Sequence, residues 1–442
     1  MPGSMPRKHA RWATRWDCWR GGMLSRQGIV LGKRGRRILF SNRKEHALVV
    51  ATTQSGKTTC FAYPTLLSWE GSVIAHDPKL ELFEVTAPWR QTFSKVVRLA
   101  PTSSCSGHYN PLEAIRLRTE QELRDVQLVS QMHHEPEGGG REKRGGATQH
   151  FSELAQEALS GLILYGLYTQ RAQTMAALNA LITQQGFRTI FEHMRSYPHA
   201  GIQRAASIIL GTTGRDESSG IFTTTTRALR IYTDPLVARM TDQSDFTLQD
   251  LRERARPMSL YLSIPFGDQE RLRMISRLLL RQYLEYCVSK QEGWTHPMLG
   301  MIDEVPGLKR MNILTDGLNY FAGYGVRLAL ITPSMEELID TYGQHHNFLD
   351  GCKINIVFGI GDAKIAKMFS DRVGKHEVVK VRHMGGKTSR EKAWEPLLSE
   401  TALMNLHERY QLVIVGRHKL LAQKAYYLDN ALWRARSAGC GI

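Results

Sequence analysis

The feature that most constrains the fold of this chain is a glycine-lysine turn that directly follows an apolar run. Residues 51–59 read Ala-Thr-Thr-Gln-Ser-Gly-Lys-Thr-Thr, and the run before them, residues 46–50, is nearly all apolar. The turn fits the pattern Gly-x-x-x-x-Gly-Lys-Ser/Thr at every fixed position except the first, where Ala51 stands. Such a turn joins the end of a strand to the start of a helix, so it predicts an α/β fold.

The residue types of this turn are those that hold phosphate groups. Backbone N–H groups and the positive end of the following helix would surround the phosphates. Lys57 would reach the β- and γ-phosphates of ATP, and the Thr58 hydroxyl would ligate Mg²⁺. An ordinary glycine turn with an exposed lysine is the alternative. The residues expected to bind the nucleotide are Thr52, Thr53, Gln54, Ser55, Gly56, Lys57, Thr58 and Thr59.

A second apolar run, residues 298–302, ends in two acids, Asp303 and Glu304. Beside a phosphate-binding turn, Asp303 would hold Mg²⁺, and Glu304 would orient and deprotonate the attacking water. Lys57, Asp303 and Glu304 are therefore the catalytic candidates, and Thr58 and Asp303 are the metal candidates. A buried strand with a solvated acidic end is the alternative interpretation of this second run.

The chain is strongly basic, and much of the excess lies at its start. Over 442 residues, 58 Lys and Arg face 42 Asp and Glu, a formal net charge of +16. A polyanionic partner, either nucleic acid or an anionic membrane face, is therefore expected. Residues 1–44 hold twelve Lys and Arg and one acid, Asp17, so they form either a solvated arm or a segment that faces membrane or nucleic acid. Trp12, Trp16 and Trp19 suit a membrane interface or the packing of a short helix.

Cysteine spacing and hydropathy exclude other classes of protein. The six cysteines lie far apart, so neither a zinc site nor a disulfide framework is expected, and a reducing cytosol fits. No apolar stretch reaches the roughly 18–20 residues that span a bilayer, and no signal peptide opens the chain. The opening, Met1 to Met5, looks like an added segment before a second start, so we expect the natural N-terminus to be missing.

Strand-like runs fall in two blocks. The first block holds residues 46–50, 72–76 and 96–99, and the second holds 259–264, 299–302, 326–331, 354–358 and 412–415. The runs are short, apolar on both faces and separated by helical patterns, which predicts a mostly parallel sheet covered by helices. A third acid, Asp77, ends the run 72–76, which we expect to lie beside the strand before the phosphate-binding turn.

The stretch between the two blocks shows only helical periodicity. We therefore predict three parts: a basic segment, residues 1–45; a nucleotide-binding domain, residues 46–112 and 256–442; and an inserted all-α domain, residues 113–255.

Three segments within the predicted insert carry expectations of their own. Residues 136–146 are rich in glycine and predict a loop. The adjacent His133 and His134 are expected to be solvated in a loop rather than to bind a metal. The threonine run 223–226 is expected to cap a helix or to lie in a loop.

The order of these motifs resembles the coupling proteins of type IV secretion systems, the TraG/TraD-like conjugative ATPases. The resemblance runs from about residue 10 to about residue 430, and an alanine at the first position of the turn is usual in that family. Besides the turn and the acidic pair, it rests on residues 10–14, Asp77-Pro-Lys79 with Glu81-Leu82, Tyr109-Asn-Pro-Leu112, the segment 246–251 with 259–262, Pro306 with Leu308, and Pro396-Leu-Leu398 with 412–415.

The resemblance implies a RecA-like P-loop domain with an inserted helical domain, assembled as a homohexamer around a channel. It implies that ATP binds between subunits and that its hydrolysis delivers substrate to a type IV secretion channel at the cytoplasmic face of the bacterial inner membrane. The substrate would be relaxase-linked single-stranded DNA, effector proteins or both, and the helical domain would contact substrate or adaptor proteins. A neighbouring subunit is expected to supply an arginine, with Arg327, Arg372 and Arg382 as candidates.

Three departures from the family pattern bear on function. Many relatives carry a glutamine that senses the γ-phosphate on the strand after the acidic pair, where this chain has Thr332 or Pro333. Leu80 stands where a glycine is common. No membrane helices precede residue 10, so either an N-terminal anchor has been removed or a separate membrane protein anchors the chain.

Two other functions stay open at this point. A nucleotide-binding substrate receptor with little ATPase activity is one, and Pro333 favours it. A double-stranded DNA translocase of the FtsK/HerA type is the other, although the helical insert and Asn110-Pro-Leu112 argue against it.

Overall fold

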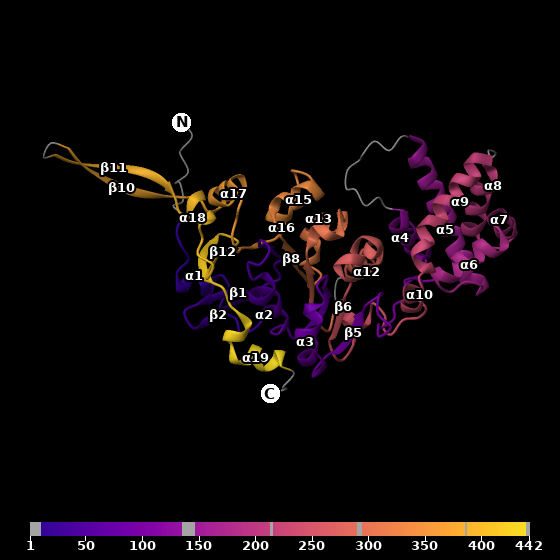
Figure 1. The fold of residues 1–442 in the computed structure, drawn as a ribbon, viewed down its shortest axis with the longest axis horizontal. Helices are drawn as coiled ribbons and strands as arrows, with labels where there is room; N and C mark the ends of the chain where they lie inside the picture. The colour runs from indigo at the N-terminus through magenta and orange to yellow at the C-terminus, as the bar shows by residue number, and fades with distance from the viewer. Residues whose placement is uncertain (1–9, 135–145, 213–214, 290–293, 385–386, 439–442) are drawn as a thin grey trace.

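The protein is built on one large sheet, with a group of helices at one end and a two-stranded arm at the other (Figure 1). The computed structural model describes residues 10–134, 146–212, 215–289, 294–384 and 387–438. Over these residues the main sheet has eleven strands in the order β2-β1-β13-β12-β9-β3-β8-β7-β4-β6-β5. None of the described helices combines the length and the apolar character needed to cross a membrane.

The centre of the sheet is parallel, as the apolar runs predict. Seven neighbouring strands pair in one direction, and most of their residues are buried because helices cover both faces. In sheet order they are β9 (Ile354–Val357), β3 (Ala47–Val50), β8 (Val326–Thr332), β7 (Met298–Asp303), β4 (Ser72–His76), β6 (Met258–Leu262) and β5 (Lys95–Leu99). The eighth predicted run forms β12 (Tyr410–Val415).

One expectation about strand order is wrong. β4 does not lie beside β3, because β8 and β7 stand between them. β4 pairs instead with β7, where His76 is opposite Ile302. Asp77, which follows β4, therefore lies beside the acidic end of β7, at Asp303 and Glu304.

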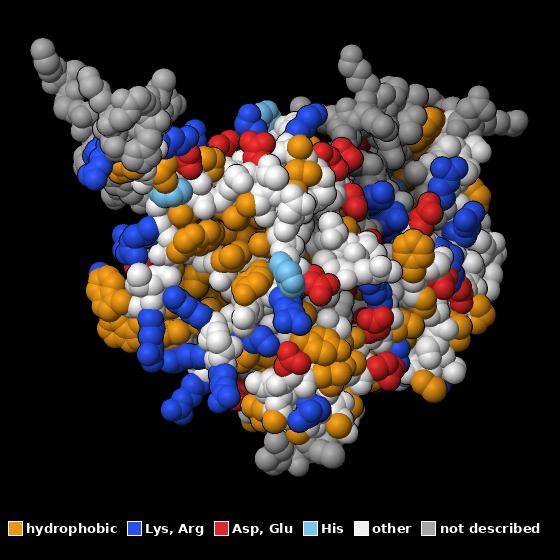
Figure 2. All heavy atoms as spheres, turned by 60° about the vertical axis from the view of Figure 1, so that its left-hand side comes forward, with side chains coloured by type: hydrophobic (Ala, Val, Ile, Leu, Met, Phe, Trp, Pro, Cys, Tyr) orange, Lys and Arg blue, Asp and Glu red, His pale blue; other side chains and the backbone are white. Residues whose placement is uncertain are grey.

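The antiparallel edge of the sheet was not predicted beyond β12. β12 pairs antiparallel with β9, and the sheet continues through β13 (His418–Gln423) and β1 (Ile29–Arg34) to β2 (Arg37–Ser41). The alternative of a solvated arm is therefore wrong for residues 29–41. Their arginines crowd the hairpin turn and mask the strand pattern. Figure 2 shows Lys and Arg side chains gathered at the lower left of the molecule, with few carboxylates among them.

A second unpredicted pair forms the projecting arm, β10 (Lys375–Met384) with β11 (Lys387–Pro396), at the upper left of Figure 1. Cross-strand ion pairs join Lys380 to Glu395 at 2.8 Å and Lys392 to Glu377 at 2.9 Å. Charged residues occur along both strands, so neither strand shows the apolar pattern of a buried one.

The described part of the predicted insert is helical and contains no strand. These helices lie at the right of Figure 1, where α5 packs against α4, α8 and α9 through Leu159, Leu162 and Ile163. The helices are α4 (Glu122–His134), α5 (Gly146–Thr169), α6 (Met175–Gln185), α7 (Phe187–Arg195), α8 (Ala200–Gly211), α9 (Arg215–Leu229), α10 (Pro235–Met240) and α11 (Asp250–Glu253), with a 3₁₀ turn, η2 (Arg230–Thr233).

Two expectations about this part are wrong, and residues 136–145 of the expected loop lie outside the described residues. His133 and His134 end helix α4 rather than lie solvated in a loop, and the His133 ring contacts the Tyr232 hydroxyl at 2.9 Å. Burial lowers the pKa of His133 to about 4, so the ring is neutral. Thr223–Thr226 lie inside α9, where the Thr224 and Thr225 hydroxyls donate to carbonyls one turn earlier.

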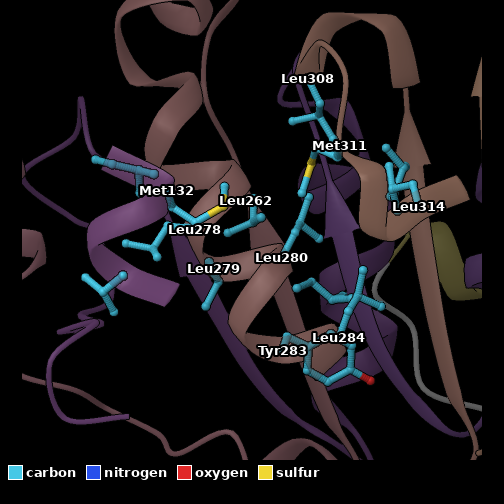
Figure 3. Packing of buried hydrophobic residues seen from close by; sticks show 14 of the residues in the cluster. Met132, Leu262, Leu278, Leu279, Leu280, Tyr283, Leu284, Leu308, Met311 and Leu314 are labelled. Carbon is cyan, nitrogen blue, oxygen red and sulfur yellow. The ribbon is translucent and has the colours of Figure 1, made fainter. Parts of the chain in front are cut away.

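Helix α12 (Gln269–Ser289) joins the helical group to the sheet. Figure 3 shows Leu278 and Leu279 of α12 close to Met132 of α4, while Leu280 lies near Met311 on the other side. The Gln282 side chain accepts from the Tyr109 hydroxyl at 2.8 Å and donates to the Pro111 carbonyl at 2.9 Å. The Asn-Pro-Leu turn singled out in the sequence is therefore fastened to α12.

The remaining described helices and helical turns lie before, between and after the strands in the sequence. They are α1 (Arg15–Arg20), η1 (Thr58–Ala62), α2 (Tyr63–Leu66), α3 (Glu81–Gln91), η3 (Phe266–Asp268), η4 (Val305–Leu308), α13 (Asn312–Asp316), α14 (Leu318–Phe321), α15 (Met335–Tyr342), α16 (Phe348–Gly351), α17 (Ala363–Val373), α18 (Glu400–Met404), η5 (Tyr427–Asp429) and α19 (Ala431–Ser437).

Candidate nucleotide-binding site

The glycine-lysine turn has the backbone of a phosphate cradle. It leaves β3 at Val50 and enters the helical turn η1 at Thr58, as the sequence predicts. Gln54 and Gly56 adopt left-handed φ values of 63° and 88°. Ala51 does not belong to the residues with positive φ, so this position does not require glycine. The departure from the strict pattern therefore leaves the loop geometry intact.

Internal hydrogen bonds shape the turn. The Ser55 N–H donates to the Thr52 carbonyl at 3.2 Å, and the Ser55 hydroxyl donates to the same oxygen at 2.6 Å. Beyond the turn, the Cys60 N–H donates to the Gly56 carbonyl at 2.8 Å. At its start, the Ala51 N–H donates to the Thr332 carbonyl of β8 at 3.0 Å. The N–H groups that precede Cys60 thus stand at the open end of a helix, where an anion is favoured.

A buried ion pair joins the turn to the acidic strand end. The Lys57 Nζ lies 3.8 Å from the Asp303 Oδ1, and only 6% of Lys57 and 2% of Asp303 is exposed. Burial raises the pKa of the Asp303 carboxyl, and the charge of Lys57 opposes that rise. The structure therefore brings together two of the three residues predicted to act in catalysis.

The donor set suits a hard divalent cation. The Asp303 Oδ1 is buried and has no hydrogen-bond partner among the described residues. Thr58 is also buried and follows Lys57 at the start of η1. Carboxylate and hydroxyl oxygens are the ligands that Mg²⁺ takes, with phosphate and water completing its shell. Thr58 and Asp303 fit the predicted role of magnesium ligands.

Glu304 occupies a strained backbone position directly after Asp303. Its φ of 75° and ψ of 67° are left-handed, and its carbonyl accepts from the Gly307 N–H at 3.1 Å as η4 begins. A glutamate seldom adopts this conformation without surrounding structure that imposes it. This backbone conformation points the side chains of Asp303 and Glu304 in different directions. Asp303 is buried against Lys57, while Glu304 stays partly exposed.

A third acid and a histidine, at the end of β4, lie beside the acidic pair. Asp77 accepts from the N–H groups of Leu82 and Phe83 at 3.2 and 3.0 Å. Burial, with a contribution from the charge of Asp303, raises the pKa of Asp77 to about 6. The neutral His76 ring donates from Nδ1 to the Asp303 carbonyl at 3.1 Å, since a carbonyl can only accept. Sequence reasoning named Asp77 but missed His76.

Pro333 lies beside the cradle, at the end of β8. With Thr52, Ser334 and Asp362, it lines a cleft of about 360 Å³ at the carboxyl ends of β3, β8 and β9. The Ser334 hydroxyl caps α15 by accepting from the Glu337 N–H at 3.1 Å. Partial burial and the charge of Glu304 raise the pKa of Glu337. Glu337 is therefore a polar group close to Glu304 that sequence reasoning missed.

Two of the three candidate arginines have described side chains. Arg327 lies at the start of β8, at the end of this strand opposite the cradle. Its guanidinium lies over the Trp69 ring at 5.0 Å and donates to the Asn42 carbonyl. These contacts hold it within its own chain. Arg372 of α17 pairs with Asp350 at 3.0 Å near the surface. The side chain of Arg382, on β10, lies outside the described residues.

The comparison with protein families agrees with this geometry. Residues 8–438 match the model of the family described as type IV secretory system conjugative DNA transfer. The chain belongs to this family.

The RecA-like P-loop fold that the resemblance implies is confirmed by solved structures of plasmid coupling protein TrwB, one with the non-hydrolysable ATP analogue ADPNP and one with ADP and Mg²⁺. Each covers 96% of both chains, with TM-scores of 0.71 and 0.70 at 18% and 19% identity.

Curated relatives extend beyond the matched region. Conjugal transfer protein TraG of Escherichia coli is 30% identical over 419 residues, which are 84% of this chain and 65% of the relative. Protein VirD4 of Rhizobium rhizogenes is 26% identical over 463 residues, which are 96% of this chain and 66% of the relative. The chain thus spans about two thirds of the length of these two relatives.

We predict that Gly56→Ala weakens ATP binding about tenfold. A Cβ there meets only ordinary contacts, Cys60 Sγ at 3.4 Å and Thr59 Oγ1 at 3.5 Å, so the cost of ~1–2 kcal/mol comes from the left-handed φ. Titration with a fluorescent ATP analogue measures the change. Ala51→Gly is the matched control and should bind within about twofold of the unmodified protein. Equal losses in both variants would contradict the assignment of the strained position to Gly56.

Proposed function

We propose that this chain is the nucleotide-driven part of a type IV coupling protein. ATP with Mg²⁺ binds at Thr52–Thr59, Asp303 and Thr58 hold the metal, and Glu304 activates the attacking water. Hydrolysis drives the delivery of relaxase-linked single-stranded DNA, effector proteins or both to a type IV secretion channel. The buried Lys57–Asp303 pair beside the left-handed cradle carries this proposal, because it sets a cation and a metal-ligating acid where phosphates would bind.

The names of the relatives support the same function. TraG and VirD4 relatives are named for conjugal transfer or type IV secretion, and TrwB structures contain ADPNP or ADP with Mg²⁺. In this proposal the chains form a homohexamer with ATP between neighbours. The helical domain, residues 113–255, contacts effector or adaptor proteins, while the domain of residues 46–112 and 256–442 hydrolyses ATP. Both described candidates bond to a carbonyl of their own chain, and Arg372 is the better placed of the two because it is exposed while Arg327 is partly buried.

A second candidate function is a substrate receptor that binds nucleotide with little turnover. Pro333 favours it, because a proline at the cleft beside Thr52 offers no donor for a γ-phosphate. ATP turnover measured with and without single-stranded DNA separates the two, since a receptor shows neither basal nor stimulated hydrolysis.

We further propose that the N-terminal part faces the inner membrane at its cytoplasmic side, next to an anchor that precedes it or belongs to a separate protein. Trp16 and Trp19 of α1 are 58% and 67% exposed, and the Arg20 guanidinium lies 4.5 Å over the Trp16 ring. Asp17, the single acid among residues 10–44, is buried and paired with Arg11 at 2.7 Å. Exposed tryptophan with uncompensated arginine suits anionic headgroups.

Lys57→Ala is expected to weaken ATP binding by about a hundredfold, because charge-assisted hydrogen bonds to phosphate worth ~1.5–3 kcal/mol each are lost. A fluorescent ATP analogue titrated against the purified protein measures this. Lys44→Ala, an exposed lysine before β3, is the control and should bind normally. Unchanged affinity in Lys57→Ala would sink the assignment of the site.

Glu304→Gln is expected to keep nucleotide affinity and to lower turnover by about 10²–10⁴-fold, because glutamine cannot accept the proton of the attacking water. Phosphate release measured at saturating ATP gives the rate. Glu400→Gln, exposed at the start of α18, is the control. If Glu304→Gln hydrolyses ATP normally, another group acts as the base.

The double variant Trp16→Ala/Trp19→Ala is expected to bind phosphatidylglycerol-containing vesicles about tenfold more weakly, because two interfacial aromatic side chains are removed. Cosedimentation measures this, and phosphatidylcholine vesicles give the uncharged reference. Trp394→Ala, on the arm, is the control. Loss of single-stranded DNA binding with vesicle binding unchanged would assign this surface to nucleic acid instead.

A further inference from the structure

A second lysine reaches the phosphate cradle from the far end of the chain. Lys424 directly follows β13, and its Nζ donates to the Ser55 carbonyl at 2.8 Å. The Lys424 N–H donates to the Arg409 carbonyl at 2.8 Å, which fixes its backbone at the base of the β12–β13 hairpin. Its ammonium lies 4.7 Å from the centre of the buried Phe358 ring.

The contact acts on the peptide between Ser55 and Gly56 in the turn. In a trans peptide the carbonyl and the N–H point in opposite directions. A hydrogen bond that fixes the direction of the Ser55 carbonyl therefore also fixes the Gly56 N–H, which points to the opposite side of the peptide. Gly56 itself has a left-handed φ of 88°, so this peptide precedes one of the two left-handed residues of the turn.

The charge of Lys424 has no ion-pair partner among the described residues, and the Glu408 charge favours it only from a longer distance. Among the described residues, no carboxylate lies within ion-pairing distance of its Nζ. The side chain is half-buried, and burial lowers its pKa. A desolvated ammonium without a counter-ion costs free energy unless an anion lies nearby. The polyphosphate that the cradle would hold is such an anion.

The segment after Lys424 contacts α2 and the residues directly after it. The Tyr427 ring meets the Tyr63 ring edge-on at 5.2 Å. The buried Trp433 indole donates to the Ser68 hydroxyl at 2.7 Å, and Arg436 donates to the Leu67 carbonyl at 2.5 Å. Residues 424–437 therefore form a strap that contacts the turn at Ser55, the start of α2 at Tyr63, and Leu67 and Ser68 directly after α2.

We propose that Lys424 is a positioning residue of the nucleotide site, which orients the Ser55–Gly56 peptide for phosphate binding and is itself held by the strap of residues 424–437. The proposal rests on the proposed nucleotide binding and adds to it a residue from the opposite end of the chain. Lys424 acts through the Ser55 carbonyl, so it affects nucleotide affinity more than the hydrolysis step.

Lys424→Met, which keeps the apolar stem and removes the ammonium, is expected to weaken binding of a fluorescent ATP analogue about tenfold. One hydrogen bond to a charged group and one nearby cation are lost. Lys424→Arg keeps both and should restore most of the affinity. Lys419→Met is the matched control, since Lys419 lies on β13, the strand that Lys424 follows, is also partly buried and has no recorded hydrogen bond to the turn.

The outcomes separate this inference from the function on which it rests. An unmodified protein that binds no ATP refutes the proposed function. Normal affinity in Lys424→Met, or an equal loss in Lys419→Met, overturns the positioning role. A rise in KM with kcat unchanged, rescued by Lys424→Arg at an unchanged unfolding midpoint, supports it. Lys424→Gln, which keeps a polar side chain without the charge, decides the matter where Lys424→Met does not fold.

Discussion

The buried pair of Lys57 and Asp303 is the interaction on which the site depends. Either charge alone would be costly in the interior, so each requires the other or a ligand of opposite charge. The pair forms because β3, β8 and β7 run parallel and in register, with Val50 opposite Thr332 and Asp303 opposite Ile331. Two strand spacings, about 9–10 Å, separate the turn from the acid, and the lysine side chain bridges that gap.

Helix α12 links this pair to the rest of the molecule. The Arg277 guanidinium donates to the Leu308 carbonyl at 3.1 Å, and Arg273 donates to the Gly307 carbonyl at 2.9 Å. Both acceptors belong to η4, which begins directly after Glu304. Further along, α12 holds the Asn-Pro-Leu turn through Gln282 and packs against α4. A rigid helix thus contacts both the loop that presents Glu304 and the helices proposed to meet substrate.

The predictable parts of the fold are those whose signal is local. Strands buried on both faces are continuous apolar runs, and all eight predicted runs are strands. The hairpin of β1 and β2 and the arm of β10 and β11 were not predicted, because their charged residues hide the strand pattern. The order of β4 was expected wrongly, because nothing in the run 72–76 specifies its neighbour. His133 and His134 were expected in solvent, because a buried neutral histidine looks like an exposed one in sequence.

The residue types proposed for the site can be recognised locally along the chain. The turn, with its lysine and threonine, is one short segment, and the two acids after an apolar run are another. The residue types of both segments suit phosphate, Mg²⁺ and water. Which groups meet at the site depends on the fold. The 3.8 Å approach of Lys57 to Asp303, the His76 contact and the Lys424 contact join residues distant in the chain. Such meetings depend on strand order and long loop closures, which local periodicity does not encode.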